Sequence, residues 1–310
     1  MQLKLGLVAL IFSLSSVDAT LVAVRQSSAV SIKSLLPVSN LKSKWTTLPG
    51  QPNALPLSDD TLRPHHVLTA LPHPFATAPD GSTRAMKAFF PKGSYTFTHE
   101  PQGGLSFYAP GPSAVNLETA KEAWFGYSVF FDKGFGFQKG GKLPGLYGGD
   151  TADGSVSCSG GRKDTTCFSA RLMWRTGGAG ELYVCLPPSS VDPKFAPNDK
   201  LCDIPNSHCN DAFGTSVARG AFTFKAGQWN TVSQRVKLND AGKANGELEL
   251  FFEGKSVILA KGLMIRGDGK GKIRGIQMQT FFGGSDESWA SPKDQNLYFA
   301  HFSAGVSQTL

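Results

Sequence analysis

Short runs of alternating apolar and polar residues, separated by turn-forming residues, fill the chain from about Lys87 to its C-terminus. Strand side chains alternate between the two faces of a sheet, so runs rich in β-branched and aromatic residues predict strands. The candidate strands are SYTFTHE, GLSFYAP, AWFGYSVFF, CFSARLMWR, GELYVCL, GAFTFKAG, WNTVSQRVKLN, GELELFFEG, KSVILAKG, KIRGIQMQTFF and LYFAHFS. Residues 118–123 predict one short helix, and no long amphipathic helix is found. The pattern therefore predicts an all-β fold, an antiparallel β-sandwich or jelly roll.

The N-terminal part of the chain differs from this pattern. Residues 1–19 combine one lysine, an apolar run from Leu5 to Leu14 and small side chains before Ala19, which is typical of a secretory signal peptide. A membrane anchor would need roughly 20 apolar residues. Residues 20–79 are rich in serine and proline and predict a partly irregular N-terminal arm, and residues 80–310 predict the β domain. We expect a secreted, extracellular protein with no membrane segment.

Composition and charge narrow the function classes. The chain has 35 glycines and 19 prolines in 310 residues, and 40% of its residues are hydrophobic, which suits a folded protein with many tight turns. Its 31 Lys and Arg residues outnumber its 24 Asp and Glu residues, giving a net charge of +7 that favours an anionic partner. Nucleic acid is one such partner, but no basic helix or nucleic-acid motif is present, so we expect none.

Five cysteines are compatible with disulfides in an exported protein. Cys158 and Cys167 flank one loop, and Cys202 and Cys209 another, each rich in Gly, Ser, Asp or Asn. We therefore predict two local disulfides and a free Cys185, with a Cys185–Cys202 bridge as the alternative. The sequence has no Cys-x-x-Cys or His-x-x-x-His pattern, so no zinc site is expected.

A glycine-rich loop of five residues joins the candidate strands at 168–175 and 181–186, which is a hairpin signal. Alternation places the apolar side chains of both strands on one face. The other face carries Ser169, Arg171, Met173, Arg175, Glu181, Tyr183 and Cys185. If the loop is symmetric about Gly178, Arg171 lies opposite Cys185. Guanidinium, phenol and hydroxyl groups on one face suit an anionic ligand, although an ordinary solvated face explains the same pattern.

The segment GGKLPGLYGG, residues 140–149, carries a second set of candidate groups. Its glycines leave Lys142 unshielded and let a ligand approach the backbone closely. Tyr147, in the same run, is a candidate contact to the ligand. A glycine-rich hairpin turn with a surface lysine is the alternative interpretation. The segment lacks the residue order of a phosphate-binding loop.

A third set of candidate groups lies near the C-terminus. In IQMQTFF, the side chains of Gln277, Gln279 and Phe281 share one face, and Trp289 follows in a polar loop. Amides offer fixed donors and acceptors to sugar hydroxyls, and aromatic rings stack on the C–H faces of sugars. These residues therefore favour a carbohydrate ligand, although Trp289 could equally cap the core.

The same segments, in this order, resemble polysaccharide lyase family 14. The resemblance rests on GGKLPGLYGG, the strand containing SAR, the GELY strand and the ending QTFFGGSDESWASPKDQNLYFAHFSA. This family contains lyases of alginate and of glucuronate polymers, and it is similar in fold to the family 20 glucuronan lyases. The resemblance implies a β-jelly roll whose concave face forms the substrate cleft.

The resemblance also implies catalytic residues. Lys142 matches the essential lysine of the family, Ser169 and Arg171 match its Ser-x-Arg pair, and Tyr183 matches the first tyrosine of its Tyr-x-Tyr pair. Cys185 stands where the second tyrosine is expected, and a thiol is a weaker hydrogen-bond donor than a phenol.

Roles follow from the chemistry of β-elimination. We expect Arg171 and Ser169 to bind the carboxylate of a uronate. Lys142 would remove the C5 proton and Tyr183 would protonate the leaving oxygen, with these two roles exchangeable. The expected substrate-binding residues are Arg175, Gln277, Gln279, Trp289 and Tyr147.

The predicted function is a secreted, monomeric polysaccharide lyase that cleaves alginate or glucuronan. No cofactor is required in this scheme, no catalytic metal is expected, and the resemblance leaves room for a structural calcium ion. One alternative is a carbohydrate-binding jelly roll without catalysis, which the replacement at Cys185 favours. Another is a glycoside hydrolase, which needs a pair of carboxylates. Glu247, Glu249 and Glu253 form one strand-borne acidic cluster, which an ordinary solvent-facing surface explains.

Overall fold

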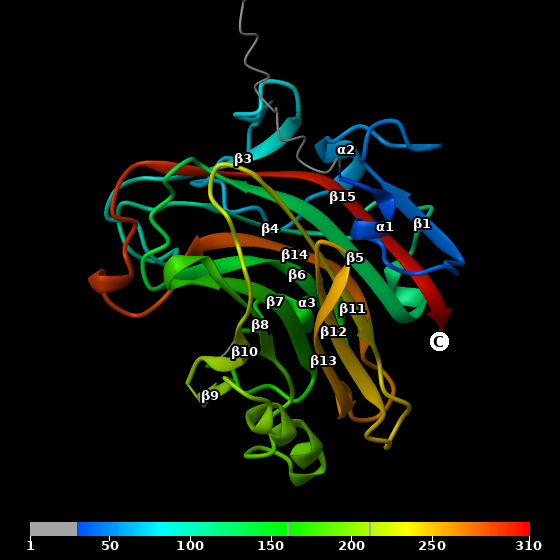
Figure 1. Cartoon of the computed structure of the whole chain (residues 1–310). Helices are drawn as coiled ribbons and strands as arrows, with labels where there is room; N and C mark the ends of the chain where they lie inside the picture. Colours follow the sequence, from blue (N-terminus) through cyan, green and yellow to red (C-terminus); the bar gives the residue numbers. More distant parts are fainter. Residues whose placement is uncertain (1–29, 160, 211) are drawn as a thin grey trace, which may run out of the picture.

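The structure, a computed structural model, describes residues 30–159, 161–210 and 212–310, so the predicted signal peptide at residues 1–19 lies outside the described residues. Two antiparallel sheets, called sheet A and sheet B here, pack face to face (Figure 1). The predicted all-β sandwich is confirmed.

Sheet A has the strand order β13-β12-β11-β5-β15-β3-β2, and β1 also pairs with β15. Its strands are β1 (Ser43–Thr46), β2 (Phe75–Thr77), β3 (Arg84–Phe90), β5 (Ala120–Phe131), β11 (Trp229–Lys237), β12 (Gly246–Phe252), β13 (Lys255–Leu263) and β15 (Gln295–Thr309). Both β1 and β2 come from the segment at 20–79, so part of that segment contributes strands to the sheet.

Sheet B has the strand order β4-β14-β6-β7-β8-β10-β9. Its strands are β4 (Leu105–Ala109), β6 (Gly140–Gly149), β7 (Cys167–Arg175), β8 (Ala179–Cys185), β9 (His208–Asn210), β10 (Gly214–Thr223) and β14 (Lys272–Phe282). β6, β7 and β8 lie near the middle of this sheet, where neighbours on both sides hold them in place.

The helices are short. They are α1 (Ile32–Leu35), α2 (Asp59–Leu62) and α3 (Ala152–Ser155), with 3₁₀ segments η1 (Leu117–Thr119), η2 (Thr176–Gly178), η3 (Pro193–Asp203) and η4 (Glu287–Trp289). Within the described ranges, none of the helices has the length and apolar character needed to span a membrane.

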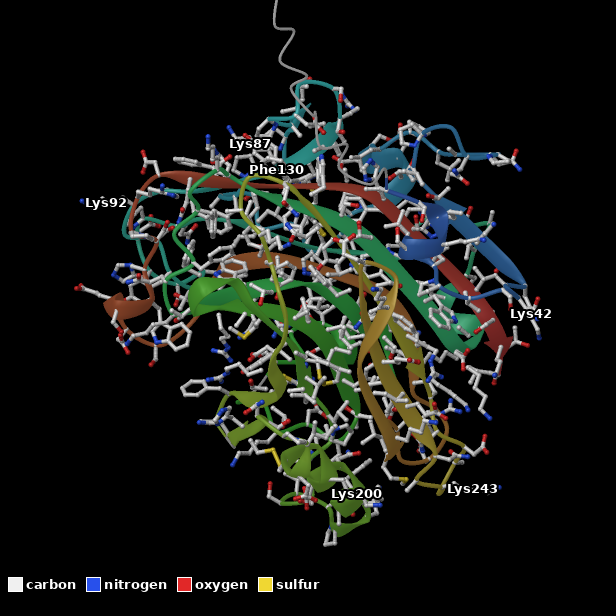
Figure 2. The ribbon with its side chains drawn as sticks, viewed as in Figure 1. Lys42, Lys87, Lys92, Phe130, Lys200 and Lys243 are labelled. Atoms are coloured by element: carbon white, nitrogen blue, oxygen red, sulfur yellow. A yellow bond between two sulfur atoms is a disulfide. The ribbon has the colours of Figure 1, made fainter. Side chains whose placement is uncertain are left out.

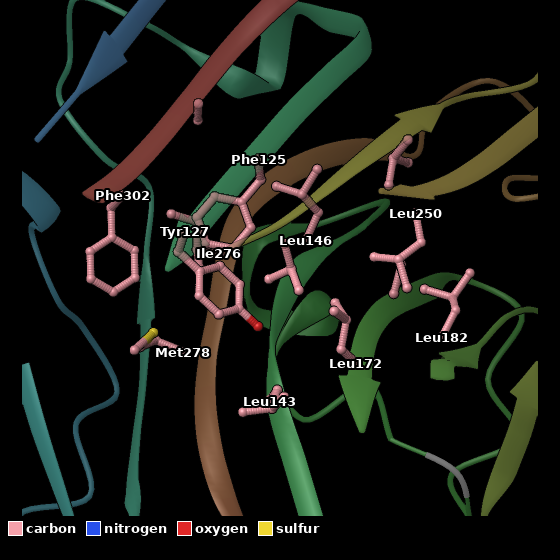
Figure 3. Close-up of a cluster of buried hydrophobic side chains, with 14 of the residues drawn as sticks. Phe125, Tyr127, Leu143, Leu146, Leu172, Leu182, Leu250, Ile276, Met278 and Phe302 are labelled. Carbon is pink, nitrogen blue, oxygen red and sulfur yellow. The ribbon is translucent and has the colours of Figure 1, made fainter. Parts of the chain in front are cut away.

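The core lies between the two sheets. Figure 3 shows the rings of Phe125, Tyr127 and Phe302 from sheet A beside Leu146 and Leu172 from sheet B. All five side chains are at most 1% exposed. Each large apolar side chain buried in this way contributes about 1.5–3 kcal/mol, so the alternating residues of both sheets supply the main stabilisation.

Two side chains from sheet A stabilise an irregular point in β6. Proline removes a backbone donor from a central strand, and the β6–β7 register shifts around Pro144. The Tyr127 hydroxyl donates to the Pro144 carbonyl at 3.1 Å. The Gln234 amide accepts from the Leu146 N–H and donates to the Ala170 carbonyl, the latter at 2.7 Å. Tyr127 and Gln234 thus satisfy backbone groups that the bulge leaves unpaired.

Some predicted elements are wrong. Residues 94–100, predicted as a strand, form turns, because Thr96 adopts a left-handed conformation with φ of 53° that a strand excludes. The predicted helix at 118–123 is only the 3₁₀ turn η1, and β5 begins at Ala120, because pairing with β11 and β15 outweighs the local preference. The strands β3 and β6 were not among the predicted runs.

Both predicted disulfides are confirmed. Cys158 is bonded to Cys167 and Cys202 to Cys209, while Cys185 is free. The alternative Cys185–Cys202 bridge is therefore wrong.

Candidate active site

A cleft of about 830 Å³ lies on the face of sheet B that points away from the core. Leu172 packs into the core, whereas Arg171, its neighbour in sequence, lines the cleft, and Leu182 and Tyr183 alternate in the same way. Of the predicted site residues, the cleft contains Lys142, Arg171, Arg175, Tyr183, Gln277, Gln279 and Trp289. The fold thus brings together residues from β6, β7, β8, β14 and η4.

Cationic groups gather along this cleft. They are Lys142, Arg171, Arg175 and Arg219. Other basic side chains, such as Lys92 and Lys200, point outward at the rim of the molecule (Figure 2). An anionic chain that enters the cleft therefore meets a local concentration of positive charge, in addition to the general positive charge of the protein.

β7 and β8 form the predicted hairpin, but in a different register. Arg171 lies opposite Tyr183, so the predicted pairing of Arg171 with Cys185 is wrong. The turn is centred on Gly177, one residue before Gly178, and the two glycines adopt φ values of 69° and 83°. Glycine reaches such angles without steric cost. The register differs by two residues, which keeps every side chain on its predicted face.

The amine of Lys142 lies beside the phenol ring of Tyr183. Its Nζ is 3.6 Å from the ring centroid and 2.8 Å from the Met173 sulfur. Burial, together with the positive charges of Arg171 and Arg175, lowers the pKa of Lys142 well below its ordinary value. The neutral amine, which is the form that accepts a proton, is therefore available at lower pH than for a solvent-exposed lysine.

Tyr183 has the opposite tendency. Its side chain is 5% exposed, and its hydroxyl donates to the backbone carbonyl of Phe213. Burial raises the pKa of Tyr183 well above the ordinary value for a phenol, and the neighbouring Cys185 adds to this shift. The hydroxyl therefore keeps its proton, so the adjacent amine and phenol differ in pKa in the direction that a base and an acid require.

The Arg171 guanidinium has a donor without a partner in the part of the chain that the structure describes. Its Nη1 donates to Gln279 Oε1 at 2.9 Å, while its Nε is buried and has no hydrogen-bond partner among the described residues. Gln277 donates to the same Gln279 oxygen at 2.8 Å. The Gln277 carbonyl oxygen is also buried without a partner in the described ranges. Unpaired buried polar groups are costly, so these atoms suit a ligand that completes their hydrogen bonds.

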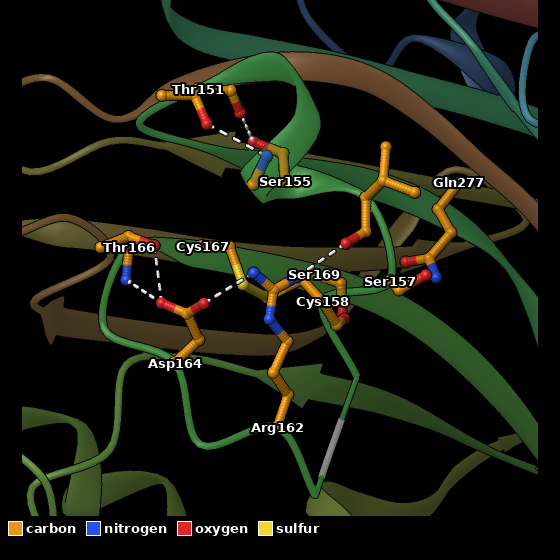
Figure 4. The surroundings of a disulfide bond; sticks show 12 residues. Thr151, Ser155, Ser157, Cys158, Arg162, Asp164, Thr166, Cys167, Ser169 and Gln277 are labelled. Atoms are coloured by element: carbon orange, nitrogen blue, oxygen red, sulfur yellow. Dashed lines mark hydrogen bonds and ion pairs between the residues drawn. A yellow bond between two sulfur atoms is a disulfide. The ribbon is translucent and has the colours of Figure 1, made fainter.

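Two predicted site residues lie outside the cleft. Ser169 is fully buried, and its hydroxyl donates to the Cys158 carbonyl at 2.8 Å beside the Cys158–Cys167 disulfide (Figure 4). Tyr147 is 2% exposed and packs edge-on against Tyr108, with ring centroids 4.7 Å apart. The structure therefore does not bring the expected contacts of Ser169 and Tyr147 to the cleft, because a disulfide-bonded loop and a neighbouring ring cover them.

Cys185 lines a smaller cavity of about 170 Å³ next to the cleft. Cys209 and Gly214 line both spaces, so the two adjoin. The position where the family resemblance implies a second tyrosine is thus occupied by a short side chain beside open volume.

Sequence reasoning missed several cleft residues. Tyr108 lies opposite Gln277 on the neighbouring strand and lines the cleft, and the alternation in LSFYA could have found it. Arg219 gave no sequence signal, because it lies in the irregular stretch of β10 between Val217 and Phe222, where the pairing with β8 shifts.

The acidic cluster that could have served a hydrolase lies in sheet A rather than in the cleft. Arg235 donates to Glu247 at 2.7 Å and to Glu249 at 2.9 Å, and Glu253 accepts from the Thr231 N–H at 2.8 Å. These carboxylates are therefore occupied by partners within their own sheet.

Comparison with known proteins assigns the class. A family model described as polysaccharide lyase 14 matches residues 78–302, and the chain belongs to polysaccharide lyase family 14. The sequence resemblance is therefore confirmed. A search of curated protein sequences found no match.

Two solved structures of alginate lyases agree with this assignment. The marine alginate lyase of this family from Aplysia kurodai is 31% identical, with 86% of this chain and 100% of that chain covered and a TM-score of 0.70. The alginate lyase from Chlorella virus is 25% identical over 86% of this chain and 100% of that chain, with a TM-score of 0.61. An endo-β-1,4-glucuronan lyase from the fungus Trichoderma reesei is 10% identical over 78% and 90% of the two chains, with a TM-score of 0.46.

Proposed function

We propose that this polysaccharide lyase cleaves 4-linked uronic acid polymers, alginate or glucuronan, by β-elimination. The observation that carries the proposal is the convergence of Lys142, Arg171 and Tyr183 in one cationic cleft. The two relatives with the higher identities are named alginate lyases, which supports a uronate polymer as the substrate.

Arg171 binds the carboxylate of the sugar that is cleaved. Its buried, unpaired Nε and the rest of its planar fork can engage both carboxylate oxygens. Negative charge develops on these oxygens when the C5 proton leaves, so a fixed guanidinium stabilises the transition state more than the ground state. Gln277, with its unpaired carbonyl oxygen, accepts a hydrogen bond from a sugar hydroxyl.

Lys142 and Tyr183 transfer the protons. The neutral Lys142 amine takes the C5 proton, and the electron pair of the broken C–H bond is delocalised into the carboxylate. The pair then forms the C4=C5 double bond while the C4–O4 bond breaks. O4 leaves with the neighbouring sugar and takes the proton of the Tyr183 hydroxyl. The opposite pKa shifts of the two groups support this assignment.

This scheme needs no cofactor, because the Arg171 guanidinium supplies the positive charge at the carboxylate.

We also propose that the protein acts outside the cell as a monomer, with residues 1–19 as its export signal. The two disulfides support an oxidising location.

A panel of uronic acid polymers tests the proposal. Mannuronate-rich alginate, guluronate-rich alginate and glucuronan are each mixed with protein, and the ultraviolet absorbance of unsaturated uronate is followed. The wild type should produce this signal on at least one polymer, whereas Lys142→Ala and Tyr183→Phe should produce none. Lys133→Ala, which removes an exposed lysine outside the cleft, should behave as wild type.

Each variant is checked for folding by thermal melting. Binding of a polymer by the wild type without any double bonds would overturn the proposal and favour the non-catalytic carbohydrate-binding alternative. Full activity of either site variant would refute its assigned role.

A further inference from the structure

A buried carboxylate beneath the cleft binds two arginines. Glu181 in β8 is fully buried. One of its oxygens accepts from Arg175 at 2.6 Å, and the other accepts from Arg219 Nε at 3.1 Å and from the Ser216 hydroxyl at 2.5 Å. Arg219 also donates to the Ser216 hydroxyl at 3.2 Å. Both carboxylate oxygens are thus occupied by the protein, so Glu181 orients these arginines rather than binding a ligand itself.

Two guanidiniums share this single carboxylate, and the three groups together carry a net charge of +2 − 1 = +1. One arginine would suffice to neutralise a buried carboxylate, so the second is an excess cation. Arg175 and Arg219 both line the cleft, with side chains 11% and 36% exposed. Arg175 Nε is buried and has no hydrogen-bond partner among the residues with described placement. The pair therefore retains both charge and donors for an anion.

The position of the pair separates it from Arg171. Arg175 follows Arg171 by four residues on the same face of β7, which places their Cα atoms about 13 Å apart at the usual strand rise. Arg219 lies on β10, beyond β8. The Arg175 guanidinium also lies over the Trp289 ring, 5.7 Å from its centroid, which restricts its orientation. A carboxylate held by this pair therefore belongs to a different sugar from the one at Arg171.

We propose that Arg175 and Arg219, positioned by Glu181, bind the carboxylate of a uronate unit that is not cleaved. The ligand class is a chain that repeats its carboxylates along its length. This inference rests on the proposed function, because it takes Arg171 to mark the cleaved unit. Its consequence is that long chains, which fill both carboxylate positions, bind better than short ones.

Arg219→Gln is the main test, since Glu181 keeps Arg175 and Ser216 as partners in this variant. KM and kcat are measured on long polymer and on short oligouronates. For polymer, KM should rise about tenfold, as expected for the loss of one charge-assisted contact, while kcat stays within about twofold. The advantage of long over short chains and the salt dependence of KM should both decrease. Lys261→Gln, which removes an exposed charge from β13, is the matched control.

Unchanged KM in Arg219→Gln would overturn the inference, as would a fall in kcat with KM unchanged. An equal rise of KM on long and short chains would also overturn it, because the position would then not belong to a distant sugar.

Glu181→Gln gives a second readout, which a purely structural role would not change. The charge of Glu181 raises the pKa of Lys142, so its removal should move the acid side of the kcat–pH profile to lower pH. If thermal melting shows that the variant is folded, an unshifted kcat–pH profile would contradict the placement of this charge. If Glu181→Gln does not fold, Arg219→Gln still decides the question.

Failure of this inference can be distinguished from failure of the proposed function. An active wild type with wild-type KM in Arg219→Gln refutes the inference alone. A wild type that forms no double bonds on any polyuronate refutes the function. In that case, calorimetric titration of long oligouronates into the Arg219→Gln protein still tests the binding position. The inference predicts that this variant binds them about tenfold more weakly than the wild type does.

Discussion

Replacing Gln234 by leucine should destabilise the protein by a predictable amount. The Gln234 amide joins the two sheets, because it accepts from the Leu146 N–H and donates to the Ala170 carbonyl. Gln234 is 2% exposed, and Leu146 and Ala170 are fully buried, so water cannot replace the lost contacts. Each buried backbone group left without a partner costs about 1–3 kcal/mol, and two such groups give about 3–4 kcal/mol as a central value. Leucine has a similar volume, so little of this loss comes from a cavity.

Urea unfolding, followed by tryptophan fluorescence and far-ultraviolet circular dichroism, measures this change. Gln308→Leu, at an exposed position near the end of β15, is the control for the change of residue type and should alter the unfolding free energy by less than about 0.5 kcal/mol. Loss of the contact to the Ala170 carbonyl should also disturb Arg171, which is the next residue. The Gln234→Leu variant should therefore lose turnover even under conditions in which it is folded. An unfolding free energy within about 0.5 kcal/mol of wild type would refute the claim that this amide supports the bulge.

Four further predictions concern catalysis. Arg171→Lys should lower kcat/KM about 100-fold, because one ammonium cannot reproduce a two-pronged contact to a carboxylate, and unchanged steady-state kinetics would contradict that role. Since the pKa of Lys142 lies well below its ordinary value of 10.5 and the base must be neutral, kcat should rise with pH as Lys142 loses its proton and should level off well below pH 10.5. Arg175→Gln removes a charge that lowers this pKa and should move the rise to higher pH, so a shift to lower pH would be the wrong sign. Cys185→Tyr places a phenol at the position next to open volume and should increase kcat, whereas an unchanged rate in a folded variant would show that the second tyrosine is not the missing element.

The side chains that share a face were predictable from the sequence. Period-two alternation placed Arg171 and Tyr183 on one face of sheet B and Leu172 on the other, and this depends only on the strands being extended. The pairing register was not predictable in the same way. It depends on which of the three loop glycines take positive φ, and only the structure shows that Gly177 and Gly178 both do so.

Long-range contacts account for what the sequence left undetermined. The segment at 140–149 is rich in glycine and contains a proline, which opposes a strand, yet pairing with β7 and β14 makes it the central strand β6. Ser169 has the right face but is covered by the disulfide-bonded loop that precedes it. The contact of Arg219 with Glu181 joins residues 38 positions apart across an irregular strand pairing, which no local pattern reveals.

The mass of the products tests the central claim most directly. A defined oligouronate that the protein cleaves is incubated with wild-type protein, and the fragments are weighed by mass spectrometry. β-Elimination adds no atoms, so the masses of the two fragments from one cut should sum to the mass of the starting oligosaccharide, and the fragment with the new non-reducing end should contain a C4=C5 double bond. Fragments that together exceed the starting mass by one water molecule would show hydrolysis and contradict the roles assigned to Lys142, Arg171 and Tyr183.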